Sequence, residues 1–310
     1  MLTYVLRRMI AGLIVIFFAS LIVFSMLYII PGDPIDILVL SQIGITQEQR
    51  VELREKLGLD QPFLKRYVDY CSNLLLHGDW GNSLVYGRYV KELILQQLPA
   101  TFQLTIAAIL FAIPLGILFG IISAVNRDSW IDTSSMFISV IGVSVPQFWM
   151  GLILILVFSI KLGLFPPMGS IGVNTLILPA ITLGFRPLAL IARISRSSML
   201  EVLNLDYITT ARGKGLTEKR VIFYHALRNA FIPILTVIGI QIGTLLSQAM
   251  IIEIVFARQG IGKLLVDSII AKDFPVVQGI ILLIAIIYII INIFIDILYH
   301  LIDPTVQIEG

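Results

Sequence analysis

Charged residues are scarce in this chain, and cysteine is almost absent. Of its 310 residues, 14% are charged and 57% are hydrophobic, whereas a soluble domain has about 25% charged residues. The single cysteine, Cys71, excludes a disulfide within the chain and a cysteine-based metal cluster. A soluble fold could not remove this much apolar surface from water, so the composition predicts a membrane protein.

The motifs of several catalytic classes are missing as well. A nucleotide-hydrolysing P-loop reads G-x4-G-K-[ST], but the two Gly-Lys pairs of this chain are followed by Gly215 and Leu264. The sequence has no H-E-x-x-H or G-x-S-x-G, and its three histidines are too scattered for a metal site. A net charge of +2 gives no reason to expect nucleic acid. We therefore expect neither an enzyme nor a chain that binds a cofactor or metal.

Long apolar runs take the place of these motifs. Six are long enough to cross about 30 Å of hydrocarbon as helices, since a helix rises about 1.5 Å per residue. Arg186 is the one charged residue within them. The first run is longer than the apolar region of a cleavable signal peptide, which is about 7–15 residues, and is interpreted as an uncleaved span. We predict an all-α polytopic membrane protein with a single transmembrane domain over 1–310, whose six helices are Met9–Ile30, Thr101–Val125, Thr133–Ile160, Ile171–Ala192, Ala230–Ile252 and Phe274–Ile295.

The distribution of Lys and Arg predicts the orientation. With the N-terminus inside, the short cytoplasmic loops hold ten basic residues and the short outer loops hold four; the positive-inside rule favours this arrangement over its inverse. Both termini are then cytoplasmic, 31–100 lies outside and 193–229 is the longest inside loop. The chain is expected in the plasma (inner) membrane of a bacterium or archaeon, surrounded by lipid.

The outer segment 31–100 has helical signals of its own. Thr46 and Gln49 form a capping-box pattern, Gly58 suits a helix end, and Pro62 suits a second helix start. The second helix carries an apolar face. A small helical cap on the outer ends of the spans is predicted, with this face formed by Phe63, Tyr67, Tyr70 and Leu74.

Polar residues inside the spans are candidates for lining a pathway. Arg186 either belongs to a short helix and reaches an interface, or contacts an anionic group of a substrate in a cavity, or forms a structural ion pair. Gln241, Thr244 and Gln248 share one helical face, which either bonds neighbouring helices or lines a hydrated path for a polar solute. The pairs Gly116/Gly120 and Gly239/Gly243 are expected to allow close helix packing.

The cytoplasmic loop has more order than a basic loop requires. Two helical stretches, Asp206–Arg212 and Leu216–Arg228, flank the glycines Gly213 and Gly215. This order predicts a short amphipathic helix parallel to the membrane and presented to a cytoplasmic partner.

The same loop resembles that of ABC importer permeases of the oligopeptide, dipeptide and nickel class. In ABC importers generally the loop reads E-A-A-x3-G-x9-I-x-L-P. Thr209, Thr210, Ala211 and Gly215 match its first part, and His225-Ala-Leu-Arg228 stands at the second. The missing Glu and Pro agree with the peptide class, which has T-A-R-x-K-G-L and H-A-L-R-N-A at these places.

Further stretches carry the resemblance along almost the whole chain. Each stretch alone is weak evidence for the family, but together they keep its order and spacing. The stretches are Pro31-Gly-Asp-Pro34, Gly78-Asp-Trp-Gly-Asn-Ser83, Ser144-Val-Pro-Gln-Phe-Trp149, Gly163-Leu-Phe-Pro-Pro-Met-Gly169, Glu253-Ile-Val-Phe256, Gly260-Ile-Gly262 and Asp303-Pro304.

The resemblance implies a type I importer fold and a set of partners. A second, homologous permease chain would complete the pathway, two cytoplasmic ATPase subunits would bind ATP and Mg²⁺, and an extracytoplasmic solute-binding protein would deliver the substrate. The coupling segment of this chain would then transmit ATPase closure to the spans, through Asp206, Thr209, Thr210, Ala211, Arg212, Gly215 and Leu216.

Two other classes remain open on the residues alone. A stand-alone secondary transporter would carry buried ionisable relays or an internal repeat, and the sequence shows neither. A membrane enzyme would need a catalytic constellation. Within the permease class we favour di- or oligopeptides as the substrate, with a nickel chelate, glutathione or an opine as alternatives.

Overall fold

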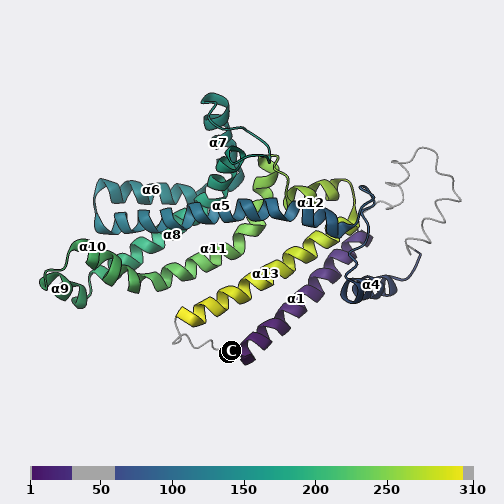
Figure 1. Ribbon diagram of the computed structural model, residues 1–310, viewed down its shortest axis with the longest axis horizontal. Helices are drawn as coiled ribbons and strands as arrows, with labels where there is room; N and C mark the ends of the chain where they lie inside the picture. Colours follow the sequence, from purple (N-terminus) through teal and green to yellow (C-terminus); the bar gives the residue numbers. More distant parts are fainter. Residues whose placement is uncertain (1, 30–59, 303–310) are drawn as a thin grey trace. The chain divides into compact units, whose positions relative to one another are not determined.

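A computed structural model describes residues 2–29 and 60–302, and side chains within 7–25 and 60–295. These parts are almost entirely helical (Figure 1), and the one β feature among them is an isolated bridge between Asn82 and Tyr89. The longest helices are α1 (Leu2–Ile29), α5 (Val90–Val125), α8 (Asn174–Leu203), α11 (Leu227–Val255) and α13 (Phe274–Ile302). The shorter ones are α4 (Phe63–Ser72), η1 (Asn73–His77), α6 (Trp130–Ser144), α7 (Gln147–Leu154), η2 (Ile155–Lys161), α9 (Asp206–Gly213), α10 (Glu218–Arg220), η3 (Val221–Ala226) and α12 (Ile261–Ile270).

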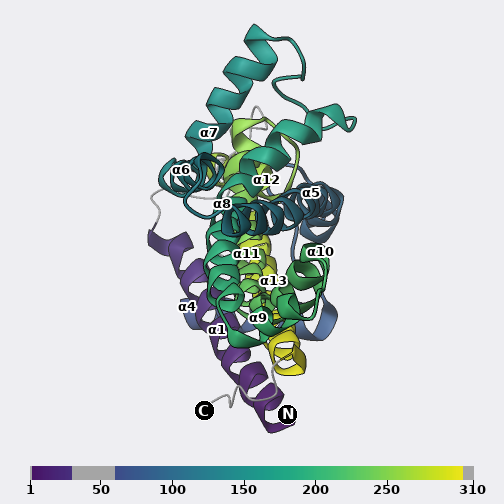
Figure 2. The same cartoon turned by 90° about the vertical axis from the view of Figure 1, so that its left-hand side faces the viewer.

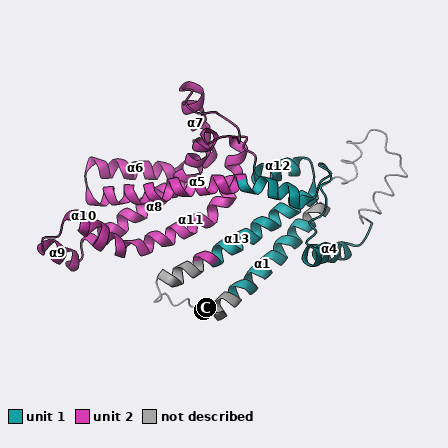
Figure 3. Ribbon diagram, viewed as in Figure 1, with its two compact units in different colours: residues 1–99, 260–293 teal, residues 100–259, 294–310 magenta. Residues whose placement is uncertain are grey.

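The chain divides into two compact units (Figure 3). Unit 1 comprises residues 1–99 and 260–293, and unit 2 comprises 100–259 and 294–310. Each unit is described separately below. Unit 2 contains the predicted cytoplasmic loop, and unit 1 contains the described part of the predicted outer segment.

Five of the six predicted spans are continuous helices long and apolar enough to cross a membrane. The prediction of Thr133–Ile160 as one helix is wrong, because α6 and the helix formed by α7 and η2 meet at an angle of 111°. Pro146 explains the break, since proline disfavours helical geometry at the residue before it. Val145 is extended there (φ −80°, ψ 129°).

Three spans are longer than their apolar runs. Helix α5 begins at Val90, α8 continues to Leu203, and the fifth span is helical from Glu218. Residues 90–100, assigned to the outer segment, and residues 193–203, assigned to the inner loop, are therefore parts of long helices. Charged residues end an apolar run, but Arg and Glu are good helix formers and do not end a helix.

In unit 2, α8 packs against α6 and α11 (Figure 2). A cluster of buried aliphatic residues joins α5, α8 and α11, and includes Leu104, Leu183, Leu245 and Ile252. Because lipid tails are as apolar as these side chains, van der Waals packing holds the helices together here, and not the removal of apolar surface from water. These contacts make α8 the central helix of the unit.

The pair Gly116/Gly120 brings α5 onto α8, as predicted. A Cβ at Gly116 would lie 2.9 Å from the Cβ of Ile191, and one at Gly120 would lie 2.3 Å from the Cβ of Ser195. Gly239 and Gly243 are buried in α11. Gly116 and Gly120 thus allow α5 and α8 to approach closely.

Replacing Gly120 by alanine is expected to destabilise the protein by about 1–3 kcal/mol, the usual cost of overpacking. The added Cβ would also lie 2.6 Å from the carbonyl oxygen of Ala192, which is backbone and cannot move alone. Gly213→Ala is the matched control, because Gly213 is helical and has no atom within 4 Å of its Cβ position. Thermal unfolding in detergent should show a lower Tm for Gly120→Ala only; an unchanged Tm would contradict the packing role.

In unit 1, α4 packs on α1 as the predicted apolar face requires. Pro62 precedes α4 directly, and Phe63, Tyr67 and Tyr70 surround Phe24 of α1. Buried residues of α5, α12 and α13 form a second core, which includes Val90, Ile94, Ile261, Val276 and Ile280. The predicted features at Thr46, Gln49, Gly58, Pro31–Pro34 and Asp303–Pro304 lie outside the described residues.

Candidate functional site

The candidate coupling segment is helix α9 with the turn that follows it. Helix α8 ends at Leu203, and the chain reverses through Asn204 and Leu205, whose extended backbone (φ −80°, ψ 148°) precedes Asp206. The Asn204 side chain donates a hydrogen bond of 2.9 Å to the Leu200 carbonyl and closes the end of α8. The predicted sequence of helix, glycine turn and second helix is confirmed, and the second helix continues into α11.

Two apolar side chains anchor α9. Ile208 is fully buried and Ala211 is 7% exposed, and their spacing places them on one helical face. They belong to a buried cluster that gathers residues from α5, α8, η3 and α11, namely Ile121, Ala124, Met199, Val221, Ala226 and Ala230. Helix α9 is therefore held by several helices of unit 2 at once.

The other side of α9 is open and polar. Asp206, Thr209, Thr210 and Arg212 are exposed, and the Thr210 hydroxyl donates to the Asp206 carbonyl at 2.9 Å. The seven predicted coupling residues thus divide into two groups. Ala211 and the half-buried Leu216 hold the segment in place, and the remaining five are accessible.

Gly215 ends α9 in a Schellman motif. Its amide donates to the Arg212 carbonyl at 2.9 Å, and the Leu216 amide donates to the Ala211 carbonyl at 3.4 Å. Gly215 has a φ of +78°, the left-handed conformation that this motif requires and that glycine adopts without strain. Leu216 packs in the same cluster as Ala211, which is the apolar contact that accompanies the motif.

The Gly215→Val variant is expected to loosen the turn, at a cost of about 1–2 kcal/mol for a left-handed residue with a Cβ. The Gly215→Asn variant should keep the turn, because asparagine tolerates this conformation and no atom lies within 4 Å of the Cβ position. Limited proteolysis of the 204–217 segment should distinguish them. Equal cleavage rates for the two variants would contradict a conformational role for Gly215.

Two polar contacts fix the sides of the segment. The Arg212 guanidinium donates to both carboxylate oxygens of Glu218, at 2.9 and 3.4 Å. The Tyr207 hydroxyl accepts a hydrogen bond of 2.7 Å from the Asn229 amide. Arg212 therefore connects the end of α9 to α10, and Tyr207 connects its start to α11.

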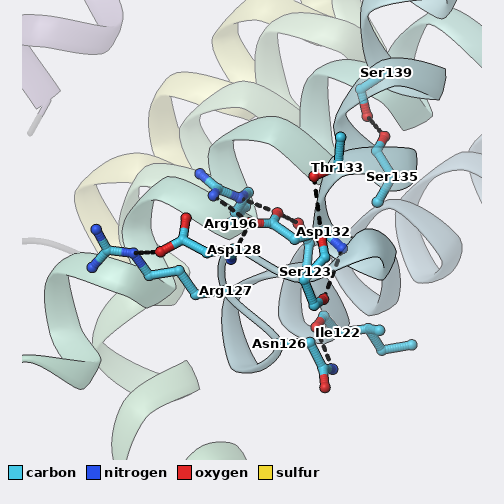
Figure 4. Close-up of polar contacts among 11 residues, drawn as sticks. Ile122, Ser123, Asn126, Arg127, Asp128, Asp132, Thr133, Ser135, Ser139 and Arg196 are labelled. Carbon is cyan, nitrogen blue, oxygen red and sulfur yellow. Dashed lines mark hydrogen bonds and ion pairs between the residues drawn. The ribbon is translucent and has the colours of Figure 1, made fainter.

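A buried ion pair that the sequence analysis missed lies in the same unit (Figure 4). Asp132, near the start of α6, is 4% exposed, and Arg196 of α8 donates to both of its carboxylate oxygens at 2.6 Å. Ser123 of α5 and the Asp128 amide also donate to this carboxylate. The helices α5, α6 and α8 thus meet at one carboxylate. Ser123 of α5 lies between Ile121 and Ala124, which belong to the buried cluster that holds α9.

Arg186 lies near the middle of the 30-residue helix α8 and is exposed. The short-helix interpretation of this residue therefore does not hold, and Arg186 forms no ion pair with another described residue. Gln248 accepts a hydrogen bond of 2.8 Å from Gln147 of α7, and Thr244 donates to the Gln241 carbonyl within α11. The bond from Gln147 agrees with the interpretation that the polar face joins helices.

Two further buried charged residues, Glu253 and Arg258, lie near the other end of α11. Glu253 is fully buried and accepts a hydrogen bond of 2.5 Å from Thr101. Arg258 is 2% exposed, donates to Gln103 at 3.4 Å, and leaves Nε and Nη1 without a hydrogen-bond partner. Burial lowers the pKa of Arg258, and the Glu253 carboxylate partly offsets this effect. The sequence placed Glu253 near a span end but gave no sign of its contacts with α5.

Long apolar helices and an anchored polar helix between two of them define a polytopic membrane permease. Comparison with known proteins gives the family. The profile described as "Binding-protein-dependent transport system inner membrane component" matches residues 116–308, and the N-terminal profile "Binding-prot-dependent transport system membrane comp, N-term" matches residues 1–105. The chain belongs to this family of ABC importer permeases, as its sequence motifs predict. It is thus a multi-pass inner-membrane component and a transport subunit rather than a catalytic one.

Curated relatives match over nearly the full length. The chain is 42% identical to the di/tripeptide transport system permease protein DppB of Pseudomonas aeruginosa (strain UCBPP-PA14), with 99% of both chains covered. It is 39% identical to the dipeptide permease DppB and 41% identical to the glutathione permease GsiC, both of Escherichia coli (strain K12), again with 99% of both chains covered. These relatives confirm that the resemblance runs along almost the whole chain.

A solved structure supports the fold. A chain of the MetNI methionine ABC transporter in an inward-facing conformation aligns with a TM-score of 0.58, at 19% identity. The alignment covers 69% of this chain and 97% of the MetNI chain. The predicted type I importer permease fold is confirmed, and the family implies an ATPase and a substrate-binding protein as partners.

Proposed function

We propose that this chain forms half of the translocation pathway of an ATP-driven importer of di- or oligopeptides, with α9 as the segment that contacts the ATPase. The anchoring of α9 carries the proposal. A helix held by Ile208 and Ala211 against α5, α8 and α11 cannot be displaced without moving those helices. A force on its polar side is therefore transmitted to three spans.

The proposed assembly has four kinds of component. A second, homologous permease completes the pathway, two ATPase subunits bind ATP and Mg²⁺ on the cytoplasmic side, and an extracytoplasmic protein binds the solute. This chain binds no cofactor, and both of its termini are cytoplasmic. The excess of Lys and Arg in the loops on the α9 side supports this orientation.

The substrate assignment has support from two sides. Permeases named for dipeptides, di- and tripeptides and glutathione are all about 40% identical to this chain. The exposed guanidinium of Arg186, in the middle of α8, would suit the carboxylate of a peptide, and Gln241 and Thr244 offer uncharged hydrogen-bonding groups. A peptide, with polar groups along its backbone and a terminal carboxylate, fits this set.

Uptake by the reconstituted complex tests the proposal. Vesicles that contain all subunits, ATP and the solute-binding protein should accumulate a radiolabelled dipeptide, and vesicles that contain this chain alone should not. Competition by an excess of unlabelled tripeptide should be strong, and competition by glutathione or a nickel chelate should be weak. Uptake by the chain alone would support a secondary transporter. Stronger competition by glutathione or the chelate would reassign the substrate.

A further inference from the structure

The backbone hydrogen-bond ladder of α8 is interrupted near the middle of the helix. In an α-helix each carbonyl accepts a bond from the N–H four residues later, and proline has no N–H to donate. Pro187 lies inside α8, so the Leu183 carbonyl has no donor at the usual position. Leu183 is fully buried, and a buried carbonyl left unpaired costs free energy comparable to a lost hydrogen bond.

The side-chain amide of Gln147 takes the place of the missing donor. Gln147 is the first residue of α7, and its Nε2 donates to the Leu183 carbonyl at 3.4 Å and to Oε1 of Gln248 at 2.8 Å. A glutamine amide carries two hydrogens, so both bonds form at once. Neighbouring helices commonly pair the backbone groups that proline frees in a membrane helix. One side chain of α7 therefore closes the gap in α8 and also binds α11.

The buried core of unit 2 divides at the same place. On the N-terminal side of Pro187, Leu183 packs in a cluster with residues of α5 and α11. On the C-terminal side, Ile191 packs in a second cluster and Met199 packs in the cluster that holds α9. The two halves of α8 are thus stabilised by different cores. Residues 183–187, called the α8 joint below, connect these halves where the helix has lost a backbone bond.

We propose that α8 flexes at the α8 joint during transport, and that Gln147 is the positioning residue that closes this joint. The proposal rests on the proposed function, in which the C-terminal half of α8 follows the ATPase through α9 and Arg186 meets the substrate. Arg186 directly precedes Pro187, so a change of angle at the joint moves its guanidinium relative to α9. Proline is among the few causes of a sharp bend in a helix, whereas an unbroken ladder would hold the two halves in one arrangement.

A double-mutant cycle on the assembled transporter in nanodiscs tests the bond from Gln147. Pro187→Ala restores an N–H four residues after Leu183, so the carbonyl no longer needs Gln147. Gln147→Leu should lower the Tm by about 2–6 °C, and by half of that or less in the Pro187→Ala background. Gln248→Leu is the matched control, because it removes only the other bond of Gln147 and should lower the Tm equally in both backgrounds. Equal losses for Gln147→Leu in the two backgrounds would show that Gln147 does not serve the carbonyl.

Transport distinguishes a joint that moves from one that is only packed. Pro187→Ala should keep or raise the Tm, because proline is costly inside a helix. It should nevertheless lower dipeptide uptake about fivefold or more and raise the ATP consumed per dipeptide. Pro179→Ala makes the same change nearer the start of α8 and should transport as the wild type does. Uptake by Pro187→Ala at the wild-type rate would overturn the flexing of α8. Pro187→Val supplies the same N–H and replaces Pro187→Ala if that variant does not assemble.

Wild-type uptake in the same vesicles reports separately on the proposed function. Absence of wild-type uptake would reject that function, while the Tm cycle would still report on the bond from Gln147. Equal uptake by the wild type and by Pro187→Ala would reject the moving joint and leave the proposed function in place.

Discussion

Replacing Thr209 by tryptophan is expected to reduce transport about tenfold or more while leaving the permease folded. Thr209 is exposed on α9, between the buried Ile208 and the exposed Thr210, so a larger side chain there meets no part of its own chain's core. On the proposed contact surface, however, an indole would displace the ATPase. A loss of about 1.4 kcal/mol of interaction already lowers association tenfold, and we expect a reduction in uptake of that size or more.

Three measurements separate this result from misfolding. The Thr209→Trp complex should show a normal Tm for the permease, weak retention of the ATPase subunits, and loss of substrate-stimulated ATP hydrolysis. Thr209→Ser is the matched control and should behave as the wild type. Ile208→Asp should lower the Tm and transport together, because it places a charge in the α9 anchor. Normal uptake by Thr209→Trp would remove α9 from the coupling interface.

Removing the buried carboxylate of Asp132 is expected to have the largest effect on stability. In the Asp132→Ala variant, Arg196 and Ser123 lose their acceptor, and loss of one partner of a buried ion pair costs about 3–5 kcal/mol. The side chain of Arg196 is 25% exposed, which allows partial solvation, so we expect about 3 kcal/mol. The Tm in detergent or nanodiscs measures the change.

The chain offers a matched control beside the buried pair. Arg127 and Asp128 form an ion pair of 3.4 Å with both side chains largely exposed, and such pairs contribute about 0–1 kcal/mol. Arg127→Ala should therefore leave the Tm almost unchanged. A double variant, Asp132→Ala with Arg196→Met, should be more stable than Asp132→Ala alone, since it removes the unpaired cation. Similar Tm values for Asp132→Ala and Arg127→Ala would show that the buried pair does not connect the helices.

Hydropathy predicted most of the fold because the bilayer imposes length and apolarity on every span. Hydropathy predicted that the spans exist but misplaced several of their ends. Helix α5 begins at Val90 and α8 ends at Leu203, and both helices extend beyond their apolar runs. Pro146, where the chain bends by 111°, was visible in the sequence. The break was not predicted, because apolar residues on both sides of the proline form one continuous run.

The α9 segment was predictable because its signals are local. Helix, glycine turn and helix succeed one another within about 20 residues, and Gly215 serves the turn as its position indicated. The Asp132–Arg196 pair was not predictable, because its partners are 64 residues apart and the pairing depends on how α6 packs on α8. The hydrogen bond between Arg258 and Gln103, which are 155 residues apart, could not be predicted for the same reason.

The anchoring of α9 has a consequence for how the transporter can diversify. The residues that hold the helix, Ile208, Ala211 and Leu216, are distinct from the exposed residues that form the proposed ATPase contact. Asp206, Thr209 and Thr210 can therefore be exchanged for those of a relative without disturbing the membrane helices. A permease built in this way could be matched to a new ATPase by a few surface substitutions, while its pathway and its cargo stay the same.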